Sequence, residues 1–182
     1  MKDETLALKR FIVAHVTFQQ VIKACEFLIS ENSDDSSQFY IPFFTGVCVS
    51  YMRPFKSAKG FGPLPPEYSK FSLNVTHART HQDLNLGRNS AYAHYSPKEA
   101  TELLPSHQQK IEQQRIRFQI RDGTALFFPP EVTWANSRLP EIISLCRFQN
   151  DRLNADIRDQ IDRLRGGKTY ENGEYIVGET FP

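Results

Sequence analysis

The chain has little of what builds disulfide frameworks, metal centres and membrane spans. It contains three cysteines among 182 residues, an odd number set far apart in apolar segments. Cysteines in this pattern predict buried, free thiols in a reducing cytosol. No apolar run approaches the ~18 residues that a membrane span needs, and the acidic, then amphipathic, N-terminus is not typical of a secretory signal. We therefore expect a cytoplasmic protein with no membrane partner.

The chain also has almost no net charge, at +1, which predicts no general attraction to nucleic acid. The charge is unevenly spread, however. The window from Arg53 to His94 holds six Lys/Arg against two acidic residues, a net +4 that leaves the rest of the chain at −3. A local field of this kind can hold an anionic partner on an otherwise neutral protein.

What is present is a helical pattern over most of the chain. Apolar residues recur at helical spacing in several segments, and the segment 36–52 is apolar nearly all round. An all-apolar helix is typical of the central, most buried element of a bundle. Pro97 prevents the fourth helix from continuing much past His94. The expected helices are residues 3–30, 36–52, 66–73, 75–92 and 137–165.

Two short segments show a different period. Residues 116–120 alternate, Asp122-Gly123 is a hairpin turn signal, and 125–128 form the return strand, which predicts a hairpin at about 115–128. A similar pattern predicts a hairpin tail at about 168–182. We therefore expect one mainly α domain over 1–182, a bundle of four to five helices with one or two small β-hairpin appendages.

One pair of residues suggests chemistry. Arg88 offers a planar guanidinium that matches phosphate oxygens and stays charged. His94, six positions later, can accept and donate a proton near neutral pH. Chemistry on a phosphodiester needs this combination of groups.

The spacing of the pair leaves two interpretations open. In a straight α-helix Arg88 and His94 are about 600° apart and do not share a face. Arg88 shares a face with His81 and Tyr92 instead. For His94 to join them, the helix must loosen or end near Ala93. Otherwise Arg88 is a surface residue and His94 a helix-terminal residue that offsets the helix dipole.

Residues 88–94 resemble the signature of the HEPN superfamily (higher eukaryotes and prokaryotes nucleotide-binding domains), an Arg followed after four to six residues by a His. Asn89 is a favoured residue after the Arg, and the run 93–96, Ala-His-Tyr-Ser, resembles an ending common in bacterial members. The run 51–55, Tyr-Met-Arg-Pro-Phe, is similar to a feature of uncharacterised bacterial HEPN-like proteins. The resemblance covers about residues 1–100 and the closing helix, and both hairpins lie outside it.

The resemblance implies a helical bundle that dimerises so that two Arg/His pairs face one cleft. Many members are metal-independent endoribonucleases of defence or toxin–antitoxin systems, and others are noncatalytic binding modules. By position, Arg88 would hold the scissile phosphate, and His94 would serve as general base or acid for attack by the RNA 2′-hydroxyl. Asn89 would orient the pair or hydrogen-bond the phosphate. The implied partners are RNA, a second copy of the chain, and an antitoxin or a nucleotidyltransferase, with no cofactor.

Other residues could complete an RNA site. Arg53 and Lys56 lie in the basic window and are candidate phosphate contacts, although Arg53 before Pro54 also suits a structural cap or an ion pair. Tyr92 could stack on a base or pack against the helices. A third interpretation is a helical partner protein, such as an antitoxin-like regulator, that uses its hairpins for contact.

His77 and His81 have three possible roles. Their i, i+4 spacing suits zinc, but Ala78 stands where a metalloprotease helix has its general-base Glu, and no third ligand is evident. The pair could instead be polar surface residues or line an RNA cleft. We expect no metal site.

Overall fold

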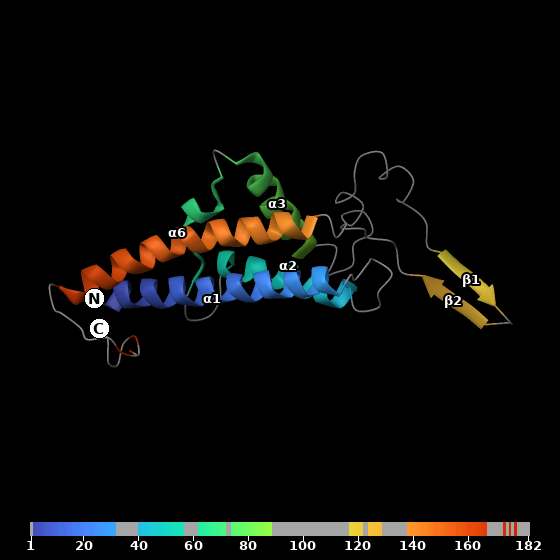
Figure 1. Cartoon of the computed structure of the whole chain (residues 1–182), viewed down its shortest axis with the longest axis horizontal. Helices are drawn as coiled ribbons and strands as arrows, with labels where there is room; N and C mark the ends of the chain where they lie inside the picture. Colours follow the sequence, from blue (N-terminus) through green and yellow to red (C-terminus); the bar gives the residue numbers. More distant parts are fainter. Residues whose placement is uncertain are drawn as a thin grey trace.

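Two long helices form the centre of the computed structural model. Helix α1 (Lys2–Ser30) and helix α6 (Leu139–Arg165) lie side by side and antiparallel (Figure 1). The structure describes residues 2–31, 40–56, 62–71, 74–88, 117–121, 124–128 and 138–166, together with 173, 175 and 177. Over these residues the chain is mainly helical, which confirms the expected class.

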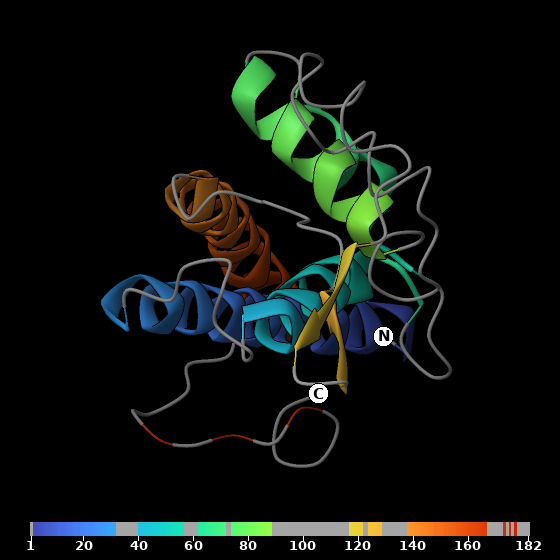
Figure 2. The same ribbon diagram turned by 90° about the vertical axis from the view of Figure 1, so that its right-hand side faces the viewer.

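Helices α2 (Tyr40–Met52) and α3 (Val75–Leu86) complete the bundle. Helix α2 packs on α1, and α3 packs on α2 and α6, so that α3 lies on the opposite side of the bundle from α1 (Figure 2). The shared core is apolar and includes fully buried side chains from all four helices. Examples are Phe18, Phe44, Leu84 and Leu145, each 0% exposed. Burial of these side chains is the main stabilising contribution.

Local signals explain where α3 begins and where α6 ends. The side chain of Asn74 accepts a hydrogen bond from the backbone N–H of His77 and caps the first turn of α3. Gly166 follows α6 with φ 54°, a left-handed conformation that glycine adopts without strain. The expectation that Gly166 ends this helix is therefore confirmed.

The expected helix at 66–73 is wrong. Residues Pro66–Ser69 form one short 3-10 turn, η2, and Lys70 is already extended, with φ −102° and ψ 122°. The cause lies in α6. Gln149 donates to the carbonyl of Tyr68 (2.8 Å), and Arg152 donates to the carbonyl of Glu67 (2.9 Å). These tertiary hydrogen bonds satisfy the carbonyls that a longer helix would use.

Helix α2 has the largest share of buried residues among the described helices, as expected, but it is not covered on every side. Its inner face is buried, with Phe44, Val47 and Tyr51 no more than 2% exposed. Its outer face is open, since Phe43 is 44% exposed and Val49 is 42% exposed. An apolar helix therefore has one face that no described residue covers.

Helix α1 is long and apolar enough to cross a membrane, judged by length and mean hydropathy alone. An 18-residue window within Glu4–Ser30 has a mean hydropathy of 1.3, and 39% of that window is buried inside the protein. The segment contains no continuous apolar run, because His15, Gln19 and Gln20 interrupt it. The core helix of a bundle passes the same test, so this property is weak support for a membrane span.

A two-stranded antiparallel sheet lies apart from the helices (Figure 1). Strand β1 (Arg117–Arg121) pairs with β2 (Thr124–Phe128), with Arg121 opposite Thr124 at the turn end. Apart from residues 173, 175 and 177, the hairpin expected at 168–182 lies outside the described residues. The three cysteines, Cys25, Cys48 and Cys146, are free and buried, as expected.

Candidate functional site

Arg88 lies at the C-terminal end of α3, where the helix changes. The α-helical pattern ends at Leu86, and Gly87 and Arg88 form a wider, π-type turn. The backbone N–H of Gly87 still donates to the carbonyls of Asp83 and Leu84, one α-type and one 3-10-type hydrogen bond, so only the π-type assignment of residues 87 and 88 marks the wider turn. Such local widening is frequent at functional sites. The helix thus changes at residues 87 and 88, whereas the sequence suggested that it loosens or ends near Ala93. Residues 89–93 lie outside the described residues.

The partners expected for Arg88 stay predictions. Asn89, Tyr92 and His94 lie outside the described residues, so their positions relative to Arg88 are untested. Arg88 itself is half-buried. It lies seven residues after His81, which places both on the same face of α3.

His81 is held in an aromatic cluster. Its ring centroid lies 4.8 Å from that of Phe55, 5.1 Å from Phe71 and 5.7 Å from Tyr51. The Tyr51 hydroxyl lies 2.9 Å from its Nδ1. Burial, together with the nearby charge of Lys56, lowers the pKa of His81 to about 4. The imidazole is therefore neutral near pH 7, and Tyr51 Oη can donate to Nδ1.

His77 faces a different helix. Its side chain is 6% exposed, so its interpretation as a surface residue is wrong. Its Nε2 lies 3.1 Å from Ser144 Oγ, and its ring packs 5.0 Å from that of Phe148. Burial lowers the pKa of His77. Because the two histidines have different neighbours, their i, i+4 spacing does not create a shared site, and no metal-ligand group of three or more His, Cys, Asp or Glu occurs among the described residues.

The expected RNA contacts Arg53 and Lys56 come from one turn. The 3-10 turn η1 (Arg53–Phe55) continues directly from α2, and the N–H of Lys56 donates to the carbonyl of Arg53 at 3.3 Å. The side chain of Arg53 is exposed and forms no ion pair with any described residue, which gives no support to its interpretation as an ion-pair partner. Lys56 is half-buried beside His81. The turn therefore places Lys56 next to the face of α3 that carries His81 and Arg88, and it leaves Arg53 exposed.

A ladder of polar contacts between α3 and α6 was missed in the sequence. The contacts join His77 to Ser144 (3.1 Å), Thr80 to Glu141 (3.3 Å) and Asp83 to Arg138 (2.8 Å). The contacting positions rise by three residues along α3 while they fall by three along α6, as expected for antiparallel helices. The polar residues at every third position of α3 were the available signal. The ladder holds the helix that carries Arg88 against the bundle.

The lowered pKa of His81 predicts a pH-dependent stability. An unfolded histidine titrates near pH 6.5, so between pH 6.5 and about 4 the unfolded chain binds a proton that folded His81 does not. Acidification through this window should lower the free energy of unfolding, and His77 should act in the same direction. His81→Phe should make the fall in the urea midpoint from pH 7 to pH 5 shallower than in wild type. Equal pH slopes for wild type and variant would show that His81 is not responsible.

Comparison of the chain with family models, curated proteins and solved structures found no match.

Proposed function

We propose that this protein binds RNA and cleaves it as a metal-independent endoribonuclease of a bacterial defence or toxin–antitoxin system. The position of Arg88 carries the proposal. It lies half-buried at the loosened end of a bundle helix, and Asn89 and His94 follow it in the sequence. A guanidinium anchored in this way suits a phosphate, because its planar fork can donate two parallel hydrogen bonds.

The proposed reaction uses the RNA as its own nucleophile. The 2′-hydroxyl oxygen attacks the adjacent phosphorus and gives its proton to His94, while the bond from phosphorus to the 5′-oxygen breaks. A proton returned by an acid completes the 5′-hydroxyl product, and the other product ends in a 2′,3′-cyclic phosphate. Arg88 stabilises the charge that develops on the phosphate oxygens, and Asn89 orients the pair or donates a hydrogen bond.

The test is an RNA cleavage assay on the purified chain. Mixed single-stranded and structured RNA is incubated with the protein in EDTA, and the product ends are identified by mass spectrometry. We expect cleavage to persist and to leave a 2′,3′-cyclic phosphate and a 5′-hydroxyl. Cleavage that needs added Mg²⁺, or that leaves a 3′-hydroxyl, would contradict the proposed chemistry.

RNA binding should depend on the η1 turn. Arg53→Ala and Lys56→Ala should each weaken binding modestly, and the slope of log affinity against log salt should become shallower by about one. Fluorescence anisotropy with labelled single-stranded RNA measures both quantities. Arg158→Ala, an exposed cation on α6, is the matched control. Salt-independent binding, or a loss confined to Arg158→Ala, would place the RNA elsewhere.

A second candidate function is a noncatalytic interaction module. The exposed apolar side chains of α1 and α2 favour it, since large apolar patches on soluble proteins mark interaction sites. An antitoxin, a nucleotidyltransferase or a second copy of the chain would be the partner. A folded protein that cleaves no RNA in the assay above but forms a stable complex would support this function.

A further inference from the structure

Apolar side chains of α1 and α2 form an exposed face on the side of the bundle away from α3. We call it the α1–α2 face. It is made of Val13 (46% exposed), Val16 (49%), Phe27 (47%), Phe43 (44%) and Val49 (42%). Phe27 and Phe43 stack at 5.5 Å and join the two helices.

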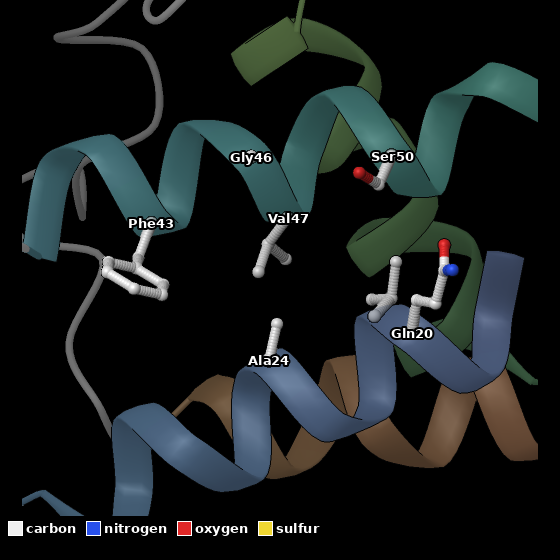
Figure 3. Close-up of a pocket in the computed structure, with 7 residues that line it drawn as sticks. Gln20, Ala24, Phe43, Gly46, Val47 and Ser50 are labelled. Atoms are coloured by element: carbon white, nitrogen blue, oxygen red, sulfur yellow. The ribbon is translucent and has the colours of Figure 1, made fainter.

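A groove of about 420 Å³ runs between the two helices on this face. Figure 3 shows Ala24 of α1 and Val47 of α2 pointing towards each other in its middle, with Phe43 at one end and Gln20 and Ser50 at the other. The middle of the groove is therefore apolar. One end carries the aromatic ring of Phe43, and the other carries the polar side chains of Gln20 and Ser50.

Gly46 gives the groove its depth. A methyl group added at Gly46 would meet no packed neighbour within 4 Å, so packing within the chain does not require glycine there. A glycine inside a helix costs roughly 0.5–1 kcal/mol relative to alanine. Close approach of a second helix is a physical reason to keep this position without a side chain.

Four exposed residues of α1 and the half-buried Ala24 at the groove have a spacing that reads the same in both directions. Val13, Val16, Gln20, Ala24 and Phe27 are separated by three, four, four and three residues, with Gln20 at the centre. A twofold axis beside Gln20 sets α1 antiparallel to α1 of a second copy. It then pairs Val13 with the second copy's Phe27, and Val16 with the second copy's Ala24.

Charge at the two ends of α1 fits the same axis. Lys9 lies eleven residues before Gln20, and Glu31 lies eleven residues after it, both on the helix face centred on Gln20. Neither forms an ion pair with a described residue. The axis brings Lys9 opposite the second copy's Glu31, and symmetry makes two such pairs. Opposite charges at both edges of an apolar stripe favour one antiparallel register.

We propose that a second copy of this chain covers the α1–α2 face, with the two α1 helices antiparallel about an axis at Gln20. Because α3 lies on the opposite side of the bundle from α1, the two Arg88 residues lie away from this interface. The dimer therefore differs from the shared Arg/His cleft that the family resemblance implies, and it does not depend on RNA cleavage.

The first test is the mass of the protein in solution. Sedimentation equilibrium from about 1 to 100 µM, the range in which modest interfaces are populated, should show a dimer for wild type. Gly46→Leu fills the groove where the chain itself leaves open space, and Val16→Glu adds a charge, so both should give monomers at about 10 µM with a wild-type circular dichroism spectrum. Val75→Glu is the control, because Val75 is 84% exposed on α3, and it should remain dimeric.

The second test addresses the register. Lys9→Glu should weaken the dimer roughly three- to tenfold, and adding Glu31→Lys in the same chain should restore it, because exposed ion pairs contribute modestly. Gln20→Cys should form an interchain disulfide under mild oxidation, whereas Gln19→Cys, exposed but off the axis, should not.

Three results would overturn the proposal. The first is a monomer at 100 µM. If that monomer bound anionic lipid vesicles through Val16, the face would be assigned to a membrane. The second is a dimer that survives both Gly46→Leu and Val16→Glu, which would place the contact elsewhere. The third is a dimer in which Gln20→Cys fails to cross-link and the charge exchange fails to restore affinity.

Discussion

His94→Ala should slow RNA cleavage by about 10²–10⁴-fold, the usual contribution of a positioned general acid or base. The expectation follows from the proposed transfer of the 2′-hydroxyl proton to the imidazole. Neither of the buried histidines can replace it, because burial lowers the pKa of His77 and of His81 and favours their neutral, partnered forms. Single-turnover cleavage of one RNA by wild type and variant gives the ratio directly.

Arg88→Ala should cost at least a similar factor, because it removes a fixed charge at the phosphate. Arg88→Lys should recover little of this loss, since a point charge cannot reproduce two parallel hydrogen bonds. Arg79→Ala is the matched control on the same helix. Arg79 is largely exposed and forms a loose ion pair with Asp83 at 3.8 Å, so its loss should change the rate little.

The outcomes of these substitutions separate two conclusions. Equal rates for wild type, His94→Ala and Arg88→Ala would assign the cleavage to a contaminant or another site. A low rate accompanied by a lower urea midpoint would indicate unfolding instead of lost chemistry. Each variant is therefore compared with wild type in both assays.

Leu84→Ala should lower the free energy of unfolding by about 2–5 kcal/mol, the usual cost of removing a buried leucine side chain and leaving a cavity. Leu84 is 0% exposed, and the other fully or nearly buried side chains of α3 are the polar His77 and Thr80. The apolar attachment of α3 to the core therefore depends strongly on this residue. Urea unfolding followed by circular dichroism measures the loss.

Val75→Ala is the control for Leu84→Ala, because it also shortens an apolar side chain of α3. Val75 is 84% exposed, so its truncation should change the free energy of unfolding by less than about 0.5 kcal/mol. A small effect of Leu84→Ala, similar to that of Val75→Ala, would show that the polar ladder with α6 suffices to hold α3. That result would indicate that the ion pair between Asp83 and Arg138 contributes more to holding α3 than Leu84 does.

Local sequence signals predicted the long helices well. The apolar periodicity of residues 3–30 and 137–165 matches α1 and α6 closely, because each helix buries one continuous stripe. Gly166 marked the end of α6, and the spacing of the cysteines indicated free thiols. These features depend on residues near one another in the chain, so a pattern along the sequence is enough to predict them.

The environment of the candidate site could not be predicted in the same way. His77 and His81 look alike in sequence, yet one contacts Ser144 of α6 and the other contacts Tyr51 of α2. The failure of the helix at 66–73 likewise depends on Gln149 and Arg152, more than 80 residues away. Distant hydrogen bonds of this kind leave no local pattern in the sequence.

The sequence alone therefore determined the two long helices, the end of α6 at Gly166, and that a basic window contains Arg88. Only the tertiary structure decided which face of each helix is buried. An apolar pattern such as that of α2 shows that burial is favourable on every side, but its neighbours, helices α1 and α3 and the turn η1, supply only part of the cover. Packing within the chain leaves the outer faces of α1 and α2 exposed, because α3 and α6 occupy the opposite side of the bundle.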